Sequence, residues 1–417
     1  MITRIEALNY RCLRYISRPL DRFHVLVGPN GSGKTTFLDV VAFLSAFVSK
    51  GLDAAIEERT RNFQDLVWMR EGCGFELAIE ARVPQEKLAK LSNGEFDTVR
   101  YEVSLEKSSD SEQVVISNER GFLSKPRVED PVQRTLFPQK PDAPQSIIGS
   151  TGGTRRLFTK ATGGNDNYYS EVTEKAGKGW MPAYKFGPKK STLGNLPEDE
   201  TKFPVATWLK NLLTEGIQSL TLNSQVIKKA SPPGQGRGFK SDGSNLPWVI
   251  ENLIKEAQGN HQDWISHLRT ALSDLVDIRT IERDDDKHRY LMICYDKGLK
   301  VPSWMASDGT LRLLALTLPA YLPALTGAFL IEEPENGIHP RAVETMIQSL
   351  SSVYDAQVLL ATHSPVILNM VEPSEVLCFA KTPDGGTDIV SGDKHPALRE
   401  WKQDVALGTL FAAGVLS

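Results

Sequence analysis

Cysteine is scarce in this sequence, and neither sign of charge dominates it. The four cysteines, Cys12, Cys73, Cys294 and Cys378, are scattered over 417 residues, with neither metal-ligand spacing nor a disulfide framework. A formal net charge of −4 gives no global basic signal for nucleic acid. We therefore expect reduced thiols and a cytoplasmic protein. We expect no leader sequence, because the N-terminus enters a β-prone stretch directly.

Sustained heptads and an unbroken membrane span are also missing. Residues 202–278 predict helices that are too short for a coiled-coil arm. Residues 313–331 carry no charge and fall inside the length window of a membrane helix, but Pro319, Pro323 and Gly327 break the run. We expect a buried helix and a buried strand there, and no membrane partner. The predicted short helices cover residues 208–213, 248–257 and 264–275.

The sequence does contain a complete phosphate-binding loop. Residues 28–35 read GPNGSGKT and match the pattern GxxxxGK[ST] at every fixed position. Residues 23–27 predict a buried strand before the loop, and residues 32–48 predict a helix after it, whose N-terminus favours phosphate. The residues expected to contact the nucleotide are Asn30, Gly31, Ser32, Gly33, Lys34, Thr35 and Thr36. Lys34 can reach the β- and γ-phosphates, Thr35 can ligate Mg²⁺, and Thr36 can donate to a phosphate oxygen.

A second apolar run, nearly three hundred residues later, ends in two carboxylates. Residues 329–334 read FLIEEP, so Glu332 is predicted to hold Mg²⁺ through water and Glu333 to polarise the attacking water. Residues 358–365 predict another buried strand, which ends at His363, a candidate γ-phosphate contact. The two halves together predict hydrolysis of ATP with Mg²⁺, with Glu333, His363 and Lys34 as the catalytic residues.

A short motif lies just upstream of these carboxylates. Ser307 and Asp308 are followed by Gly309 and Thr310; taken alone, this is an ordinary turn in which Ser307 or Asp308 caps a helix. The four elements together resemble the ATP-binding-cassette (ABC) superfamily. There, a Ser-Gly-Gly-like signature at a helix N-terminus contacts the γ-phosphate bound to a second subunit. Ser307 and Gly309 match its two key positions, whereas Asp308 and Thr310 depart from the transporter consensus.

The finer resemblance is to non-transporter branches of that superfamily. These are the ATPases of the overcoming-lysogenization-defect (OLD) nuclease family, the recombination mediators and the chromosome-maintenance ATPases. Residues 5–13 are similar to their opening strand and turn, which implies that Arg11 lies near the nucleotide. Residues 332–340 and 242–246 are close to OLD-like AAA-type ATPases, although the first carboxylate is often Asp where this chain has Glu332. No acidic cluster resembles a TOPRIM nuclease site, and only about fifty residues follow His363.

The resemblance implies an α/β fold, namely an ABC-type P-loop ATPase head. We expect a mixed sheet with an antiparallel β meander at residues 75–82, 98–107 and 112–118, a helical lobe, and an irregular insertion with a hairpin at residues 155–173. The expected parts are residues 1–122 (first part of the head), 123–200 (insertion), 201–278 (helical lobe) and 279–417 (second part of the head, with signature, Walker B, D-loop and His363).

Four smaller features complete the predictions. Residues 284–286 read as a solvated hairpin turn, and residues 198–200 as charge that favours a helix N-terminus. Gln64 is a weak match to the glutamine that contacts Mg²⁺ in cassette heads. The tail, residues 397–416, is a candidate docking element or a final helix on its own head.

The leading functional hypothesis is an ATPase subunit of a prokaryotic anti-phage defence system. It would form a homodimer or a higher homo-oligomer through composite ATP sites and gate a separate effector protein, such as a nuclease. One alternative is a DNA repair ATPase of the recombination-mediator type; another is a nucleotide-sensing scaffold with little turnover. A transporter head is disfavoured by the signature and by residues 335–337. The DNA alternative would use the basic residues Lys189, Lys190, Lys228, Lys229, Arg237 and Lys240.

Overall fold

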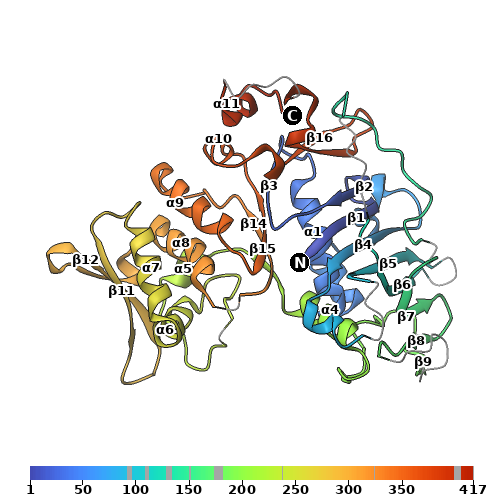
Figure 1. Ribbon diagram of the computed structural model, residues 1–417, viewed down its shortest axis with the longest axis horizontal. Helices are drawn as coiled ribbons and strands as arrows, with labels where there is room; N and C mark the ends of the chain where they lie inside the picture. The colour runs from blue at the N-terminus through green and yellow to red at the C-terminus, as the bar shows by residue number, and fades with distance from the viewer. Residues whose placement is uncertain are drawn as a thin grey trace.

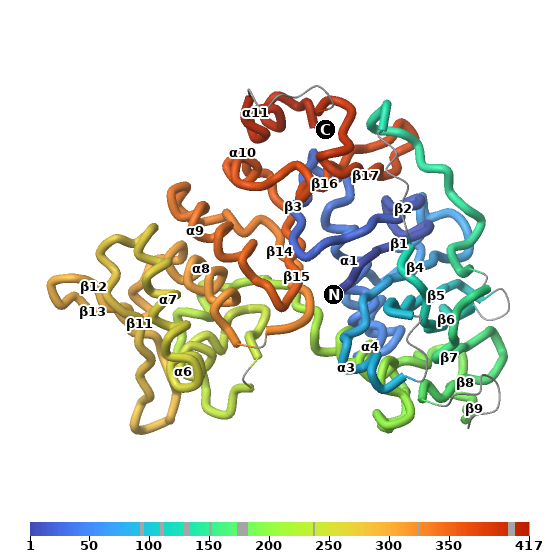
Figure 2. Tube along the Cα trace, in the orientation of Figure 1, coloured from blue at the N-terminus to red at the C-terminus, as the bar shows by residue number. Residues whose placement is uncertain are grey.

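The fold consists of two large sheets that face each other across one helix, with a helical lobe against the second sheet. The computed structural model describes residues 1–91, 96–108, 112–127, 134–149, 152–172, 182–236, 238–323, 325–398 and 405–416. In Figure 1 the first sheet lies on the right, the second in the centre and the lobe on the left, and Figure 2 shows the same order along the tube.

The first sheet is antiparallel and has eight strands. Its strands alternate apolar and polar side chains; in β1, for example, Ile5 and Ala7 face the core while Arg4 and Glu6 face the other side. The three meander strands expected from the sequence are β4, β5 and β6, and β6 runs on to Ser124. In order across the sheet the strands are β2 (Leu13–Pro19), β1 (Ile2–Tyr10), β4 (Gly74–Arg82), β5 (Thr98–Lys107), β6 (Val114–Ser124), β7 (Arg155–Ala161), β8 (Asp166–Tyr168) and β9 (Ala183–Tyr184).

The second sheet has six strands, five of them parallel. β3 and β15 are buried along their whole length, as expected for parallel strands that are covered on both faces. β3 lies between β15 and β16, so the sheet joins the beginning and the end of the chain. In order across the sheet the strands are β10 (Ile217–Leu220), β14 (Gly327–Glu332), β15 (Ala356–Ala361), β3 (Phe23–Val27), β16 (Val376–Lys381) and the antiparallel β17 (Thr387–Ser391).

Helix α1 (Lys34–Lys50) fills the space between the two sheets. Most of its surface is apolar, and Phe37, Phe43 and Phe47 are fully buried. The helix starts two residues later than predicted, because Gly33 is left-handed at its N-cap. Around it lie the short helices α2 (Leu52–Glu57) and α3 (Gln85–Leu88) and the longer α4 (Pro204–Thr214). Since α4 packs on α1, it belongs to this core.

The lobe covers the opposite face of the second sheet. It contains a three-stranded antiparallel sheet, in which residues 284–286 form the predicted hairpin turn between β11 and β12. A helix and a strand, α8 and β14, occupy the uncharged run at residues 313–331. Within the described ranges, no helix is long and apolar enough to cross a membrane. The lobe elements are α5 (Ser224–Ile227), α6 (Leu246–Glu256), α7 (Gln258–Leu268), β11 (Leu275–Glu282), β12 (Arg289–Tyr295), β13 (Lys300–Pro302), α8 (Asp308–Thr317) and α9 (Pro340–Ser351).

The sheets and the lobe begin and end at other residues than the boundaries expected from the sequence. β6 crosses the boundary at residue 122, and β7 to β9 extend the first sheet. The apolar residues of β7 and β8 pack on the same core. The hairpin expected at residues 155–173 is present as β7 and β8. α4 and β10 fall in the range expected for the lobe, yet they pack in the head, and the lobe continues through β13 and α8.

A strap, residues 134–149, runs over the outer face of the first sheet. The Ile147 N–H donates to Glu76 Oε2 (2.7 Å), and the Ile147 side chain packs on Leu8 and Ala78. At its other end the strap reaches β17, where Arg134 and the Gln139 N–H both contact Asp388 Oδ2 at 2.7 Å. The strap therefore connects the outer face of the first sheet to the edge of the second.

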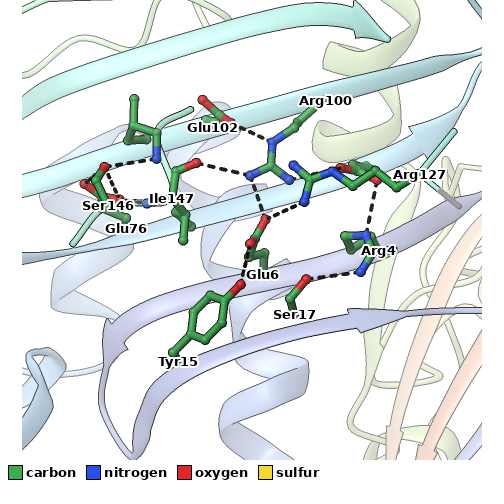
Figure 3. Close-up of polar contacts among 12 residues, drawn as sticks. Arg4, Glu6, Tyr15, Ser17, Glu76, Arg100, Glu102, Arg127, Ser146 and Ile147 are labelled. Carbon is green, nitrogen blue, oxygen red and sulfur yellow. Dashed lines mark hydrogen bonds and ion pairs between the residues drawn. The ribbon is translucent and has the colours of Figure 1, made fainter. Parts of the chain in front are cut away.

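Beneath the strap lies a buried charge network (Figure 3). Arg100 is 2% exposed and contacts three carboxylates: Glu6 (2.6 Å), Glu80 (3.1 Å) and Glu102 (2.6 Å). Arg4 adds a contact to Glu80 at 3.3 Å. Burial alone would lower the pKa of Arg100, but the carboxylates outweigh it and raise that pKa. The guanidinium is therefore the central cation of this face.

Replacing Arg100 should destabilise the fold strongly. In an Arg100→Ala variant three carboxylates would lose their central cation in a covered face and keep only the more peripheral Arg4, Arg120 and Arg127. Such a defect costs up to about 3–5 kcal/mol. The free energy of unfolding from urea titration measures the loss. Arg279→Ala is the matched control, because Arg279 is 66% exposed and pairs with Asp277 at the surface, where such pairs contribute about 1 kcal/mol or less. Equal losses in the two variants would contradict a structural role for the network.

Candidate functional site

The loop after β3 lies directly on the β16–β17 hairpin. A Cβ at Gly28 would lie 2.2 Å from the Phe379 carbonyl oxygen, and a Cβ at Gly33 would lie 2.3 Å from Thr387 Oγ1. Both glycines also have positive φ, 148° and 102°. Glycine is therefore required at these two positions, both for the backbone conformation and for the close approach.

The hairpin also holds the loop by hydrogen bonds. Thr387 Oγ1 donates to the Ser32 carbonyl (2.9 Å), and the Thr387 N–H donates to the Cys12 carbonyl (3.0 Å). At the tip of the loop, a Cβ on Gly31 would lie 3.2 Å from Lys381 Nζ. The sequence analysis missed Thr387 and Lys381, because no local pattern links them to a loop about 350 residues away.

A cavity of about 190 Å³ opens above the loop and gathers most of the predicted site. It joins residues from both ends of the chain, since β3 and β14 carry the two motifs on neighbouring parts of one sheet. Cys12 and Ala361 also line it, although neither was predicted. The lining residues are Cys12, Asn30, Gly31, Gly33, Lys34, Thr35, Thr36, Glu332, Glu333, Ala361 and His363.

The loop's polar groups fit a phosphate chain. Lys34 Nζ donates to the carbonyls of Gly28 (2.8 Å) and Pro29 (3.1 Å), so the ammonium is held at the loop. Burial lowers the pKa of Lys34, and the carboxylates Glu333 and Glu332 oppose that shift. Ser32 is fully buried, and its hydroxyl has no hydrogen-bond partner among the described residues. A phosphate oxygen would satisfy these donors.

Two oxygen donors lie together where the sequence predicts a metal ion. Thr35 Oγ1 donates to Glu332 Oε2 at 2.6 Å. A hydroxyl and a carboxylate are hard donors suited to Mg²⁺, which usually completes its shell with water and phosphate oxygens. No group of three or more His, Cys, Asp or Glu in the described part of the chain could hold a metal alone. The donor set thus fits an ion that arrives with a nucleotide.

The second carboxylate is held in an unusual backbone conformation. Glu333 has a φ of 46°, and its N–H donates to the Ala361 carbonyl (2.8 Å). Its side chain accepts a hydrogen bond from the Asn336 amide. The next acid, Glu335, accepts from Thr362 Oγ1 (2.5 Å) and from the His363 N–H (3.3 Å). This network positions Glu333 and His363 at one cavity, and the sequence analysis did not assign Glu335 that role.

The surroundings of His363 favour a neutral imidazole. Partial burial lowers the pKa of its imidazole, and the nearby Lys34 ammonium lowers it further, while Glu333 and Glu335 act in the opposite direction. A neutral imidazole can donate one hydrogen bond and accept another, which suits a contact to a phosphate oxygen.

Ser307 and Gly309, by contrast, do not line this cavity. Ser307 caps α8 by accepting from the Thr310 N–H (3.1 Å), as one of the two predicted interpretations requires. A Cβ at Gly309 would lie 2.4 Å from the Gly337 carbonyl oxygen, so α8 begins directly against the segment after Glu333. Ser307 and Asp308 are exposed. Within one chain, the signature and the loop are therefore separate surfaces.

Arg11 and Gln64 are not among the residues that line the cavity. Arg11 has a φ of 51°, pairs with Asp39 of α1 at 3.1 Å, and lines a neighbouring cavity together with Thr35 and Glu332. Gln64 lies in a short 3-10 helix, Phe63–Leu66, and its buried Oε1 has no partner in the ranges described. Their contacts with nucleotide and metal stay predictions.

Several basic residues proposed for DNA have protein partners. Lys189 pairs with Asp53 (3.0 Å), Lys228 pairs with Asp308, and Lys240 Nζ donates to Gln235. Lys190 contributes its carbonyl to Lys160 Nζ (3.0 Å), and Lys229 lines a surface cavity. Arg237 lies outside the described residues. These contacts do not favour the DNA alternative.

The tail folds back on the head where it is described. Gly408 packs so closely on α10 (Pro365–Leu368) that a Cβ there would lie 2.1 Å from the Pro365 carbonyl oxygen. Leu407 and Leu416 are buried. α11 (Leu407–Ala412) is thus a final helix on its own head, while residues 399–404 of the tail lie outside the described ranges. At residues 198–200, Glu200 pairs with Lys87.

Two stretches of the chain match families of ATPase domains. Residues 1–120 match a family described as "AAA ATPase domain", and residues 184–369 match one described as "AAA domain, putative AbiEii toxin, Type IV TA system". The first stretch holds the phosphate-binding loop, and the second holds Ser307, Glu333 and His363. Neither stretch covers half of the chain. Among curated proteins, none matches the sequence.

Solved structures share the fold at low sequence identity. One is an Smc head bound to the C-winged helix domain of ScpA: TM-score 0.53, 12% identity, 93% of this chain and 97% of that chain. Another is the Smc head domain with an extended coiled coil, bound to the C-terminal domain of ScpA derived from Pyrococcus furiosus: TM-score 0.52, 12% identity, 99% of this chain and 98% of that chain. The predicted α/β fold, an ABC-type P-loop head with a mixed sheet and an antiparallel meander, is confirmed.

Cys12 should report nucleotide binding directly. Its thiol donates to Thr36 Oγ1 at 3.3 Å in the cavity wall, so a bound nucleotide would cover it. At a nucleotide concentration ten times Kd, alkylation of Cys12 by N-ethylmaleimide should slow about tenfold. Mass spectrometry of the labelled peptides measures both rates in one sample. The exposed Cys73 is the internal control and should react at one rate throughout. Equal protection of both thiols, or protection of neither, would contradict nucleotide binding in this cavity.

Proposed function

We propose that this AAA/ABC-type P-loop ATPase, which has the fold of an SMC head, binds and hydrolyses MgATP at the cavity above Gly28–Thr35. Its turnover would depend on a second copy of the chain. The single observation that carries the proposal is the convergence of Lys34, Thr35, Glu332, Glu333 and His363 on one cavity, from strands at opposite ends of the sequence.

Each side chain has a role that its position supports. Lys34 neutralises the β- and γ-phosphates, and the N-terminus of α1 adds its dipole. Glu333 accepts a proton from the attacking water, and Asn336 orients that carboxylate. His363 contacts a γ-phosphate oxygen. Thr35 and Glu332 would hold Mg²⁺, which supplies charge neutralisation at the phosphates.

The exposed signature supports a composite site. Ser307 and Gly309 lie at the exposed N-terminus of α8, outside the cavity of their own chain, and Gly309 rests on Gly337. An exposed helix N-terminus is suited to a phosphate. In a two-fold symmetric dimer each Ser307 would face the nucleotide of the partner, so ATP would close the dimer and hydrolysis would release it.

The dimer cycle would gate a separate effector, such as a nuclease, in prokaryotic anti-phage defence. Two observations support a separate partner and a defensive role. Both Smc heads of similar fold are bound to a domain of another protein, ScpA. The family matched by residues 184–369 is named for a toxin of a type IV toxin–antitoxin system. Of the two alternatives, the nucleotide-sensing scaffold predicts that function survives the loss of Glu333. The DNA repair ATPase predicts salt-dependent binding to DNA.

A Glu333→Gln variant should bind ATP but not hydrolyse it. Removing the proton acceptor should lower turnover by about a hundredfold or more, and the trapped nucleotide should hold the variant as a dimer or larger assembly. Phosphate release assays and light-scattering mass, with and without MgATP, measure both effects. Glu344→Gln on α9 is the matched control, since Glu344 is exposed and its side chain accepts a hydrogen bond from Gln348 of the same helix. A Glu333→Gln variant that keeps wild-type function in cells would favour the scaffold.

Mixing two inactive variants tests whether the site is shared. Lys34→Ala removes the phosphate contact, and Ser307→Arg blocks the signature, so each variant alone should be inactive. A mixed dimer would contain one intact site, formed by the loop of one chain and the signature of the other. The equimolar mixture should therefore regain up to roughly a quarter of wild-type turnover. If the mixture stays as inactive as its components, the shared site is wrong, whereas an active Ser307→Arg variant would exclude the signature role.

A further inference from the structure

A second cavity, of about 440 Å³, adjoins the nucleotide cavity. The two cavities share Thr35 and Glu332, so the hydrogen bond between these side chains (2.6 Å) forms part of the wall between them. This wall lies at the predicted metal position. Any rearrangement of Thr35 and Glu332 around an ion would therefore change the connection between the two spaces.

The second cavity lies between the head and the lobe. Arg11 comes from the turn between β1 and β2, Asp39 from α1, and Ser219 from β10. On the lobe side the wall is Arg312 of α8, the helix that begins with the signature. We call this space the arginine cavity. It meets the nucleotide cavity at Thr35 and Glu332, and Ser307 is not among the residues that line it.

Arg312 is incompletely satisfied in the arginine cavity. Its Nη1 reaches the Leu222 carbonyl only at 3.5 Å, and its buried Nε has no hydrogen-bond partner among the residues described. A buried N–H of a guanidinium without a partner is costly, and its planar fork matches the oxygens of a phosphate. The geometry therefore favours an oxyanion beside Arg312.

The other charges of the cavity leave room for that anion. Asp39 is shared by Arg11 (3.1 Å) and Arg59 (2.7 Å), and it also accepts from the Tyr10 hydroxyl (2.6 Å). Its charge is thus already compensated. Glu332 lies at the Mg²⁺ position and would be neutralised by the ion. The hydroxyls of Ser219 and Thr221 add neutral hydrogen-bonding capacity.

We propose that the arginine cavity receives the inorganic phosphate formed by ATP hydrolysis, with Arg312 as its principal ligand. This inference rests on the proposed function. Water forms a bond to the γ-phosphorus, the bond from that phosphorus to the β–γ bridging oxygen breaks, and Glu333 takes a proton from the water. ADP keeps the bridging oxygen. In the closed dimer the partner's signature covers the front of the phosphate, so the wall at Thr35 and Glu332 offers the way out.

The test is a titration of MgADP-saturated protein with inorganic phosphate, followed by isothermal calorimetry. The variant Arg312→Met keeps the length of the side chain and removes its charge. It should weaken phosphate binding about tenfold or more, because a charged hydrogen bond is lost, while MgADP affinity stays within twofold. Arg312→Lys keeps the charge without the fork and should give an intermediate affinity. The control is Arg279→Met, which replaces an exposed arginine in the lobe and should bind phosphate like wild type.

The outcomes separate this inference from the function on which it rests. If wild type binds no MgADP, the proposed function is wrong, and this inference is wrong as well because it rests on that function. If MgADP binds and both Arg312 variants bind phosphate like wild type, the anion rests in the nucleotide cavity and this inference alone is wrong. If the Arg312 variants lose affinity for a non-hydrolysable ATP analogue but not for phosphate, Arg312 contacts the γ-phosphate of bound ATP, which also overturns it.

Discussion

The contact between the phosphate-binding loop and the β16–β17 hairpin is the constraint on which the site depends. Phe379 and Thr387 approach the loop so closely that only glycine fits at residues 28 and 33. Thr387 also fixes the loop by its bond to the Ser32 carbonyl. Because the loop lies directly against the β16–β17 hairpin, α1 leaves it in one direction, between the two sheets. The nucleotide cavity is therefore shaped by a hairpin that carries none of the recognised motifs.

The strap, residues 134–149, connects the β16–β17 hairpin to the rest of the head. Asp388, the neighbour of Thr387, accepts from Arg134 and from the Gln139 N–H, and the same strap covers Arg100 and its carboxylates on the first sheet. The strap that covers the buried charges therefore also connects the antiparallel sheet to Asp388, the residue beside the loop contact. A polar sheet face that would otherwise meet water is used here as an attachment surface.

Local signals in the sequence were enough for the elements that carry the motifs. β3, α1, β14 and β15 follow from apolar runs next to Gly28–Thr35 and Glu332, and the meander follows from alternation along β4 and β5. The partners of these elements could not be predicted in the same way. The apolar positions of α4 define a buried face but do not say that this face meets α1.

The rest of the site depends on distant packing. Thr387 and Lys381 reach the loop through the pairing of β16 with β3, and no pattern in the sequence indicates that register. Cys12 reaches the cavity from the turn between β1 and β2. Residues 134–149 have the composition of an irregular insertion, yet they form the strap, because their role rests on single contacts such as Ile147 to Glu76.

The central strand order also has a consequence for biosynthesis. β3 lies between two strands that follow it by more than three hundred residues, and the Ile2 N–H donates to Gln357 across a separation of 355 residues. A nascent chain thus carries its loop and the apolar β3 without these neighbours until β15 and β16 have been synthesised, which favours slow folding and a need for protection on the ribosome.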